Sequence, residues 1–321
     1  MKKEVILIIN VLGLYVTFLT WSILQERINT KPYQDQYFKS PLIINLIQAF
    51  FASIVGYIYS IIKKSNPFDI FKTHTTKLFG WLLLISLTSS LSSPIGYKSL
   101  THLDYLAYLL AKSCKLIPVM FVHFIFYKTK FPLYKYIVAC LVTFGVIIFT
   151  FAHKQEKTRI NDGNTPLGLV YLIGSMLLDG LTNSTQDQLF KLPVNLTGAK
   201  LMCILNLFVF ILTLGYTIIF TNELTYGYNF ILNHNEVIYD ILLFSGCGAI
   251  GQVFIFVILE KFDSIILITA TVTRKMLSMV LSVLLFGHYL NINQIIGIIL
   301  VFGGISYEAL IKLTKKKKHI D

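Results

Sequence analysis

Charged residues are scarce in this sequence. Asp, Glu, Lys and Arg together make up only 14% of its 321 residues, against about 25% in an average soluble domain. Acidic side chains are the rarer sign, with 16 Asp and Glu against 28 Lys and Arg. A soluble domain of this length carries far more charge, so the composition argues against an ordinary soluble protein.

Cysteine and the common catalytic motifs are also nearly absent. The four cysteines, Cys114, Cys140, Cys203 and Cys247, each lie inside an apolar run, and none pairs by motif. They are typical of small packing residues in helices, not of a disulfide framework or a metal site. The sequence has no CxxC, HExxH, Walker A or GxGxxG motif. We therefore expect no bound metal and no cofactor.

Apolar runs of about 20 residues recur along the whole chain, enough for a helix to cross a bilayer core of about 30 Å. The first run is too long for a secretory signal and is expected to be retained as a span. The run at 78–100 is the most polar and contains Pro94. The predicted spans are 4–24, 40–62, 78–100, 104–127, 133–152, 167–190, 197–220, 237–259, 263–286 and 291–311.

The net charge of +12 follows from membrane topology and needs no nucleic acid. With ten spans, both termini lie on one side of the membrane. That side carries 17 basic residues, and the opposite side carries seven. The positive-inside rule therefore places both termini in the cytosol.

The two halves of the chain are weakly similar to each other. A shift of 159 positions aligns 104–149 with 263–308 without a gap and places Lys115 on Arg274. Five spans per half give the repeats opposite orientations, which is the architecture of secondary transporters. The sequence thus predicts an all-α integral membrane protein with two inverted five-helix repeats. The segments are a first repeat at 1–153, a connecting loop at 154–166, a second repeat at 167–311 and a basic tail at 312–321.

Four cations lie inside predicted spans: Lys112, Lys115, Arg274 and Lys275. A charge at the bilayer centre costs about 2.5–3.5 kcal/mol on insertion scales, so these side chains are not expected to face lipid. They could pair with buried acids, the candidates being Glu26, Asp179, Asp187 and Glu308. They could extend to the headgroups. They could also form an anion site in a water-filled cavity, which we favour because a diphosphate suits converging Arg and Lys side chains.

Polar residues near these spans complete the predicted site. Glu26 ends the first span, either as a solvated helix end or as a gate that pairs with a cavity cation when substrate is absent. Asp179 is expected to bond Ser or Thr neighbours or to cap or kink its helix with Gly180. Gln25, Asp179 and Gln186 are the further residues predicted to line the cavity.

Four stretches resemble a known family: "SILQER" (22–27), "LAKSCKLIPVM" (110–120), "SMLLDGLTNSTQD" (175–187) and "TVTRKMLSMVLSVLLF" (271–286). They resemble the nucleotide-sugar transporters of the drug/metabolite transporter superfamily. Within these, they resemble the UDP-galactose transporter homologue 1 group, subfamily B of solute carrier family 35. The "FYNN" and "GALNK" motifs of the GDP-mannose branch are absent here.

The resemblance implies an antiporter of the endoplasmic-reticulum membrane that moves UDP-galactose into the lumen in exchange for a nucleotide. It implies that Lys112, Lys115, Arg274 and Lys275 line the phosphate site and that Glu26 helps to gate it. Members are also described as ATP/ADP exchangers, which stays open as the alternative. The partners are then the nucleotide substrate and membrane lipid.

The tail "KKKKHID" resembles a dilysine retrieval signal, but its lysines lie fourth and fifth from the end, and His319 is third. Coat-protein recognition of this tail and an endoplasmic-reticulum address are therefore expectations, with the Golgi as the alternative. A basic cytosolic end near anionic lipid accounts for the same residues.

Two other function classes fit less well. An intramembrane aspartyl protease needs the paired "YD" and "GxGD" motifs, and the chain has only a lone "LDG". We therefore expect a carrier, not an enzyme. A non-transporting membrane factor for lumenal folding would have no use for an inverted repeat.

Overall fold

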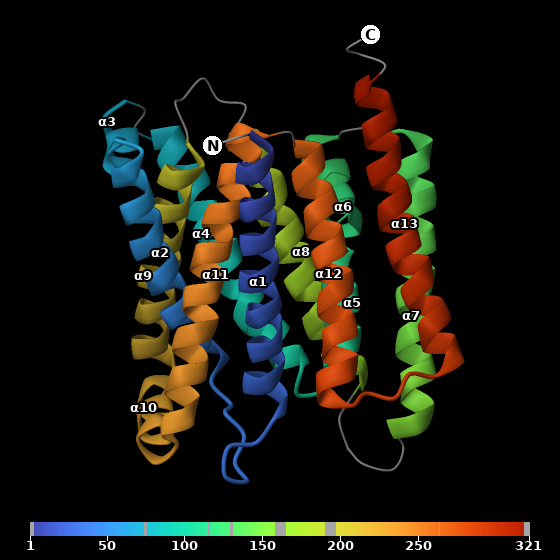
Figure 1. Ribbon diagram of the computed structural model, residues 1–321. Coiled ribbons are helices and arrows are strands. Elements are labelled where there is room, and N and C mark those ends of the chain that lie inside the picture. The colour runs from blue at the N-terminus through green and yellow to red at the C-terminus, as the bar shows by residue number, and fades with distance from the viewer. Residues whose placement is uncertain are drawn as a thin grey trace.

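Long helices build this protein, which is described by a computed structural model over residues 3–73, 76–114, 116–128, 131–157, 165–189, 197–262 and 264–317. The helices stand side by side in alternating directions, and α1 begins at the same end at which α13 finishes (Figure 1). We call this end the termini end. The elements are α1 (Lys3–Thr30), α2 (Pro41–Ile62), η1 (Pro67–Asp69), α3 (Ile70–Thr73), α4 (Thr76–Ser99), α5 (Tyr105–Ser113), α6 (Leu116–Tyr127), α7 (Leu133–Lys157), α8 (Thr165–Leu189), α9 (Gly198–Phe220), α10 (Glu223–Asn233), α11 (Asn235–Lys261), α12 (Ser264–Phe286) and α13 (Ile292–Lys317).

Nine helices of the described residues are long and apolar enough to cross a membrane, and α5 with α6 would make a tenth span. The all-α, multi-pass prediction is thereby confirmed. The predicted span 104–127 is divided into α5 and α6, which meet at a bend of 49°. Pro118 explains the break, because proline donates no backbone hydrogen bond and its ring clashes with the carbonyl four residues earlier, here that of Cys114. Pro94, in contrast, lies inside an unbroken α4.

Three short elements lie in the connections between the long helices. The helix α10 caps the end opposite the termini, between α9 and α11, in a segment without a predicted element (Figure 1). At the termini end, η1 and α3 follow α2. Of the four cysteines, Cys114 and Cys203 are buried as expected for packing residues, whereas Cys140 is exposed.

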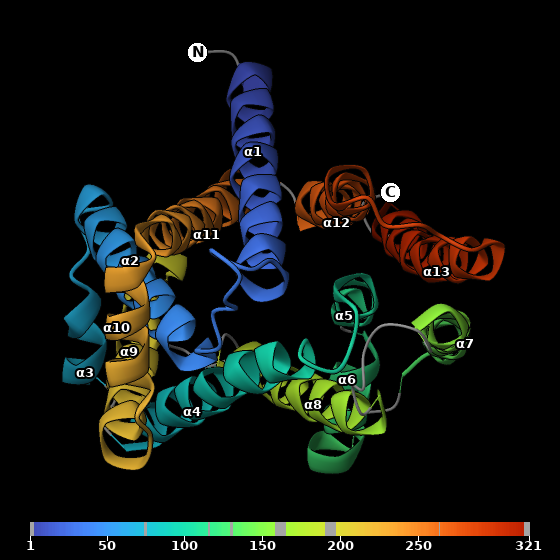
Figure 2. The ribbon, with the colours of Figure 1, turned by 90° about the horizontal axis from the view of Figure 1, so that it is seen from below.

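The helix contacts follow the same pattern in both halves of the chain. The helix α2 packs on α9, and α7 packs on α13, at opposite edges of the bundle (Figure 2). The contact of α4 with α8 corresponds to that of α11 with α1, and the contact of α6 with α8 corresponds to that of α12 with α1. Exchanging the halves therefore reproduces the contact set. This pattern supports the proposed division into repeats at 1–153 and 167–311.

Small residues allow the closest helix approaches, as is common in membrane bundles. Gly145 of α7 and Gly297 of α13 face each other so closely that a Cβ atom on Gly145 would lie 2.9 Å from the Gly297 carbonyl oxygen. Gly180 of α8 lies against Pro118 of α6, where a Cβ atom would meet the proline carbonyl group at 2.7 Å. Both contacts are with backbone, which a rotamer change cannot relieve.

Gly180→Ala is expected to destabilise the protein by about 2 kcal/mol, the usual cost of forcing an extra methyl group into a packed contact. The matched control is Gly174→Ala on the same helix, where nothing lies within 4 Å of the added Cβ atom. That control should be neutral or stabilising, since alanine favours helix over glycine by about 1 kcal/mol. Thermal unfolding of the purified variants in detergent measures both. Equal effects of the two substitutions would contradict the close α6–α8 contact.

Candidate functional site

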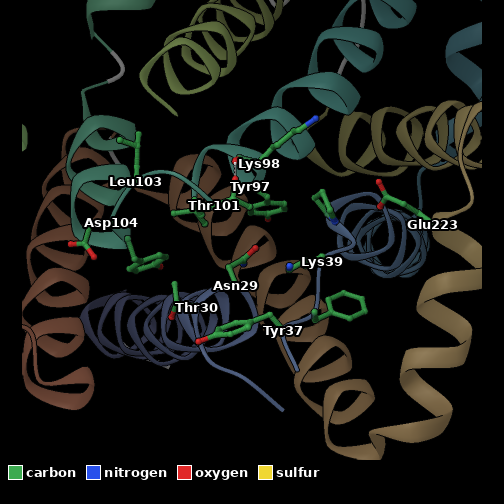
Figure 3. A pocket seen from close by; sticks show the side chains of 14 residues that line it. Asn29, Thr30, Tyr37, Lys39, Tyr97, Lys98, Thr101, Leu103, Asp104 and Glu223 are labelled. Carbon is green, nitrogen blue, oxygen red and sulfur yellow. Dashed lines mark hydrogen bonds between the residues drawn. The ribbon is translucent and has the colours of Figure 1, made fainter. Parts of the chain in front are cut away.

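A polar vestibule opens at the end of the bundle opposite the termini (Figure 3). Its volume is about 650 Å³. The side chains of Asn29, Tyr37 and Tyr97 point into it, while the amino group of Lys98 points away. The polar lining residues are Asn29, Thr30, Tyr37, Lys39, Tyr97, Lys98, Thr101, Asp104, Tyr105 and Glu223. None of the predicted site residues that the structure describes lines this space.

The inner wall of the vestibule is a hydrogen-bonded contact between α5 and α1. The hydroxyl of Tyr105 donates toward the Ser22 carbonyl oxygen at 2.9 Å and toward Gln25 Oε1 at 3.2 Å. Tyr105 is 1% exposed and Gln25 is 3% exposed. Tyr97 and Tyr108 also interact with the Gln25 side chain. Gln25, which the sequence predicted to line the cavity, therefore lies directly behind the wall of the vestibule.

Arg274 on α12 lies on the inner side of this wall. Its guanidinium carbon is 4.6 Å from the centre of the Phe18 ring, and it interacts electrostatically with Tyr105. The Nε atom is buried and has no hydrogen-bond partner among the described residues. Arg274 also has no carboxylate partner within the described part of the chain, so a bound anion could satisfy it.

Lys275 and Lys112 lie in different surroundings. The Lys275 ammonium donates to the Ser113 carbonyl oxygen at 3.4 Å, which places it at the break between α5 and α6. Lys115, predicted to share the phosphate site, lies outside the described residues. Lys112 points toward α8, away from this group.

Lys112 forms an ion pair across the α5–α8 interface. Its ammonium lies 2.6 Å from Asp179 Oδ2 and 2.6 Å from Ser175 Oγ. Ser92 of α4 donates a hydrogen bond to the other oxygen of Asp179. The expectation that Asp179 bonds a serine neighbour agrees with this contact. For Lys112 the structure thus has the first of the three alternatives, pairing with an acid inside the bundle, although Asp179 is only half-buried.

Glu26 is buried and is held by a histidine. The carboxylate is 1% exposed, and His288 Nε2 donates to its Oε1 at 2.6 Å. Glu26 forms no ion pair with a lysine or arginine of the described residues. The hydrogen bond to Glu26 is the main cause that raises the pKa of His288 above its ordinary value. His288 carried no signal in the sequence, because it lies 262 positions from its partner.

The remaining candidates are less informative. Gln186 is half-buried on α8 and makes no side-chain hydrogen bond within the described part of the chain. Glu308 is buried on α13, and the Asp187 side chain lies outside the described residues. Among the described residues, no cluster of three or more His, Cys, Asp or Glu side chains could hold a metal ion.

Comparison with known proteins gives a consistent result over nearly the whole chain. The sequence profile of the UAA transporter family matches residues 6–312. A Candida albicans protein named "UDP-galactose transporter homolog 1" is 65% identical, covering 99% of this chain and 92% of that protein. The protein of the same name from Debaryomyces hansenii is 60% identical, and the match covers 99% of this chain and 98% of that protein. The one from Saccharomyces cerevisiae is 42% identical, and the match covers 98% of this chain and 96% of that protein. The resemblance to nucleotide-sugar transporters is confirmed.

A solved structure described only as "Crystal structure of protein" has the same fold. Its TM-score is 0.57 at 12% sequence identity, and the match covers 92% of this chain and 96% of that one. At this identity the likeness concerns the helical architecture alone.

Proposed function

Because this chain belongs to the UAA transporter family, a family of nucleotide-sugar transporters, we propose that it is an antiporter of the endoplasmic-reticulum membrane. It carries a nucleotide sugar, with UDP-galactose as the first candidate, from the cytosol to the lumen in exchange for a nucleotide. The relatives named for UDP-galactose transport support this choice of substrate. The protein is a transporter rather than an enzyme.

The main support for this proposal is Arg274, a half-buried arginine whose Nε atom is buried and which has no carboxylate partner among the described residues. Arg274 lies behind the vestibule wall, where water and substrate can reach it once Tyr105 separates from α1. Removing a cation from water costs free energy unless an anion compensates it. The diphosphate of a nucleotide sugar supplies that anion, and guanidinium binds phosphate through a fork of donors.

The proposed binding group combines Arg274 with Lys275 and Lys115. The main role proposed for Lys112 is its ion pair with Asp179. Binding of the phosphate is its second, alternative role. Glu26 acts as the gate, through the contact that it makes with His288. With both termini in the cytosol, the vestibule faces the lumen, and the halves rock about the site to expose it alternately. No cofactor takes part in this cycle.

Counter-transport in proteoliposomes tests the proposal. Vesicles are preloaded with UMP, UDP-galactose, ADP or ATP, and labelled UDP-galactose or ATP is added outside. We expect uptake of intact UDP-galactose only when a nucleotide is present inside. Uptake of ATP against ADP would keep the antiport and change the substrate to ATP. Absence of every exchange by folded protein would overturn the proposal.

Exchange is also expected to depend on salt. The KM for UDP-galactose should rise about threefold or more between about 50 mM and about 500 mM salt, since the Debye length falls from more than 10 Å to less than 8 Å over this range. Sucrose of equal osmolarity is the control and should leave KM unchanged. A KM that is the same at both salt concentrations would mean that charge does not attract the substrate.

The address in the endoplasmic reticulum remains part of the proposal, with the Golgi as the alternative. Its support is the basic end of the chain, of which the last four residues, 318–321, lie outside the described residues. Removing the four-lysine run and imaging a tagged protein in cells tests it. Movement of the protein to the Golgi is the expected result, and an unchanged location would reject coat-protein recognition of this tail.

A further inference from the structure

Two adjacent residues near the end of α1 are held by different halves of the protein. Gln25 accepts a hydrogen bond from Tyr105 of α5, in the first half. Glu26 accepts one from His288, in the connection between α12 and α13 of the second half. The two contacts together fix this end of α1 against both halves at the vestibule end.

Glu26 depends on His288 for its compensation. The carboxylate is 1% exposed, and its Oε2 atom is buried with no hydrogen-bond partner among the described residues. A buried carboxylate is costly unless it is paired and hydrogen-bonded. The 2.6 Å contact with His288 is the one ion pair of Glu26 within the described part of the chain. Losing the charge on the imidazole therefore weakens the attachment of α1.

The chain around His288 is built to present it at this position. Gly287, which follows α12, adopts a φ of +67°, a left-handed conformation that glycine takes without strain. The turn directs His288 back to α1, while its backbone N–H donates to the Val283 carbonyl at 3.2 Å. Its side chain is 23% exposed, so the ring can exchange protons with solvent at this end of the molecule.

Three charged side chains face His288, from two parts of the chain. Glu26 and Lys31 lie on α1 and just beyond it, and Asp104 lies before α5. The two carboxylates favour the imidazolium and Lys31 opposes it. The ring of Phe286, at the end of α12, is 6.5 Å from the imidazole. Asp104 also lines the vestibule, so the histidine lies close to the lumen-facing space.

We propose that His288 is the positioning residue of the proposed gate: as an imidazolium it holds Glu26, fixes α1 to the second half while the vestibule is open, and makes exchange respond to pH on the vestibule side. This inference rests on the proposed transport function. It differs from a gate in which Glu26 pairs with a cavity cation.

The sign of the pH effect follows from the contact. As the pH rises through the pKa of His288, which lies above the ordinary histidine value, the imidazolium loses its proton, and the attachment that accompanies the open vestibule is lost. A smaller fraction of the protein then has its vestibule open, which raises the apparent KM for nucleotide added from that side. We expect a rise of roughly tenfold, the value of about 1.4 kcal/mol for one charge-assisted hydrogen bond. The KM measured from the termini side should not rise.

The test compares two histidines at the same end of the molecule. His288→Gln removes the charge, and His102→Gln is the matched control, because His102 stacks on Tyr171 and makes no ion pair among the described residues. Exchange is measured in oriented proteoliposomes with the vestibule-side pH set to 6, 7 or 8. Wild type and His102→Gln should show the rise in KM, while His288→Gln should have the high KM at every pH. An unchanged pH dependence in His288→Gln would overturn the inference.

A substrate-free measurement separates this inference from the proposed function. The titration of His288 is followed by NMR of histidine-labelled protein in detergent, with Glu26→Gln for comparison. We expect a midpoint above that of a free histidine, about 6.5, and a lower midpoint in Glu26→Gln. If this holds and no nucleotide exchanges, the transport proposal fails and the ion pair stands. If nucleotide exchanges and the midpoint is ordinary in both proteins, the positioning role is wrong.

Discussion

Replacing Arg274 by glutamine should abolish measurable exchange of nucleotide, with a loss of about 100-fold or more in kcat/KM. Removing one partner of a buried charge pair costs about 2–5 kcal/mol, and about 1.4 kcal/mol is a factor of ten. The structure gives the guanidinium no carboxylate among the described residues, so in this account its partner is the substrate phosphate. Initial rates of labelled UDP-galactose uptake in preloaded vesicles measure the effect.

Two controls separate charge from geometry and from general effects. Arg274→Lys keeps the charge but loses the fork of donors, and we expect it to retain a small part of the activity. Lys261→Gln removes an exposed cation at the end of the preceding helix, α11, and should exchange at the wild-type rate. Near wild-type exchange by folded Arg274→Gln protein would show that this arginine does not bind the phosphate.

Breaking the Lys112–Asp179 pair is expected to destabilise the protein, and removing both charges is expected to restore it. Lys112→Gln and Asp179→Asn should each cost about 2–3 kcal/mol, below the value for fully buried pairs, because the side chains are 18% and 34% exposed. The double variant leaves no unpaired charge and should come within about 1 kcal/mol of wild type. Thermal unfolding of all four proteins in detergent gives the coupling.

The same four proteins decide what Lys112 does for exchange. Since the ammonium already contacts Asp179 and Ser175 at 2.6 Å, we expect the folded double variant to exchange at a rate within about threefold of wild type. A double variant that is stable but inactive would mean that Lys112 contacts the substrate directly. If the stability losses of the two single variants add up in the double variant, Lys112 and Asp179 do not form an ion pair.

Much of the architecture could be predicted from the sequence, because membrane-spanning helices are recognised by their length and hydropathy. The ten predicted spans correspond to nine long helices and the α5–α6 pair. Pro118 within the fourth predicted span was a signal from which its bend could have been predicted. The helix α10 was not predicted, because its 11 residues sit in a connection and carry no span signal.

The partners of the polar residues were less accessible. The sequence offered Asp179 as one of four candidate acids but did not show which of them pairs with Lys112, 67 positions away. It did not point to His288, which lies 262 positions from Glu26. Such pairs are set by how the helices pack, which local patterns do not contain. The tyrosines around Gln25 were missed for a related reason. Tyr105 and Tyr108 share a helix face, yet 18 tyrosines in the chain gave no reason to select them.

Ligand binding to the purified wild-type protein tests most directly whether Arg274 belongs to a phosphate site. Binding is measured as thermal stabilisation by UDP-galactose, UDP, uridine and galactose. We expect UDP-galactose and UDP to stabilise the protein and uridine and galactose not to, because the membrane-embedded cations bind the diphosphate. The Arg274→Gln variant should lose this stabilisation. Equal stabilisation by uridine and UDP, or full stabilisation of Arg274→Gln, would contradict a phosphate site at this arginine.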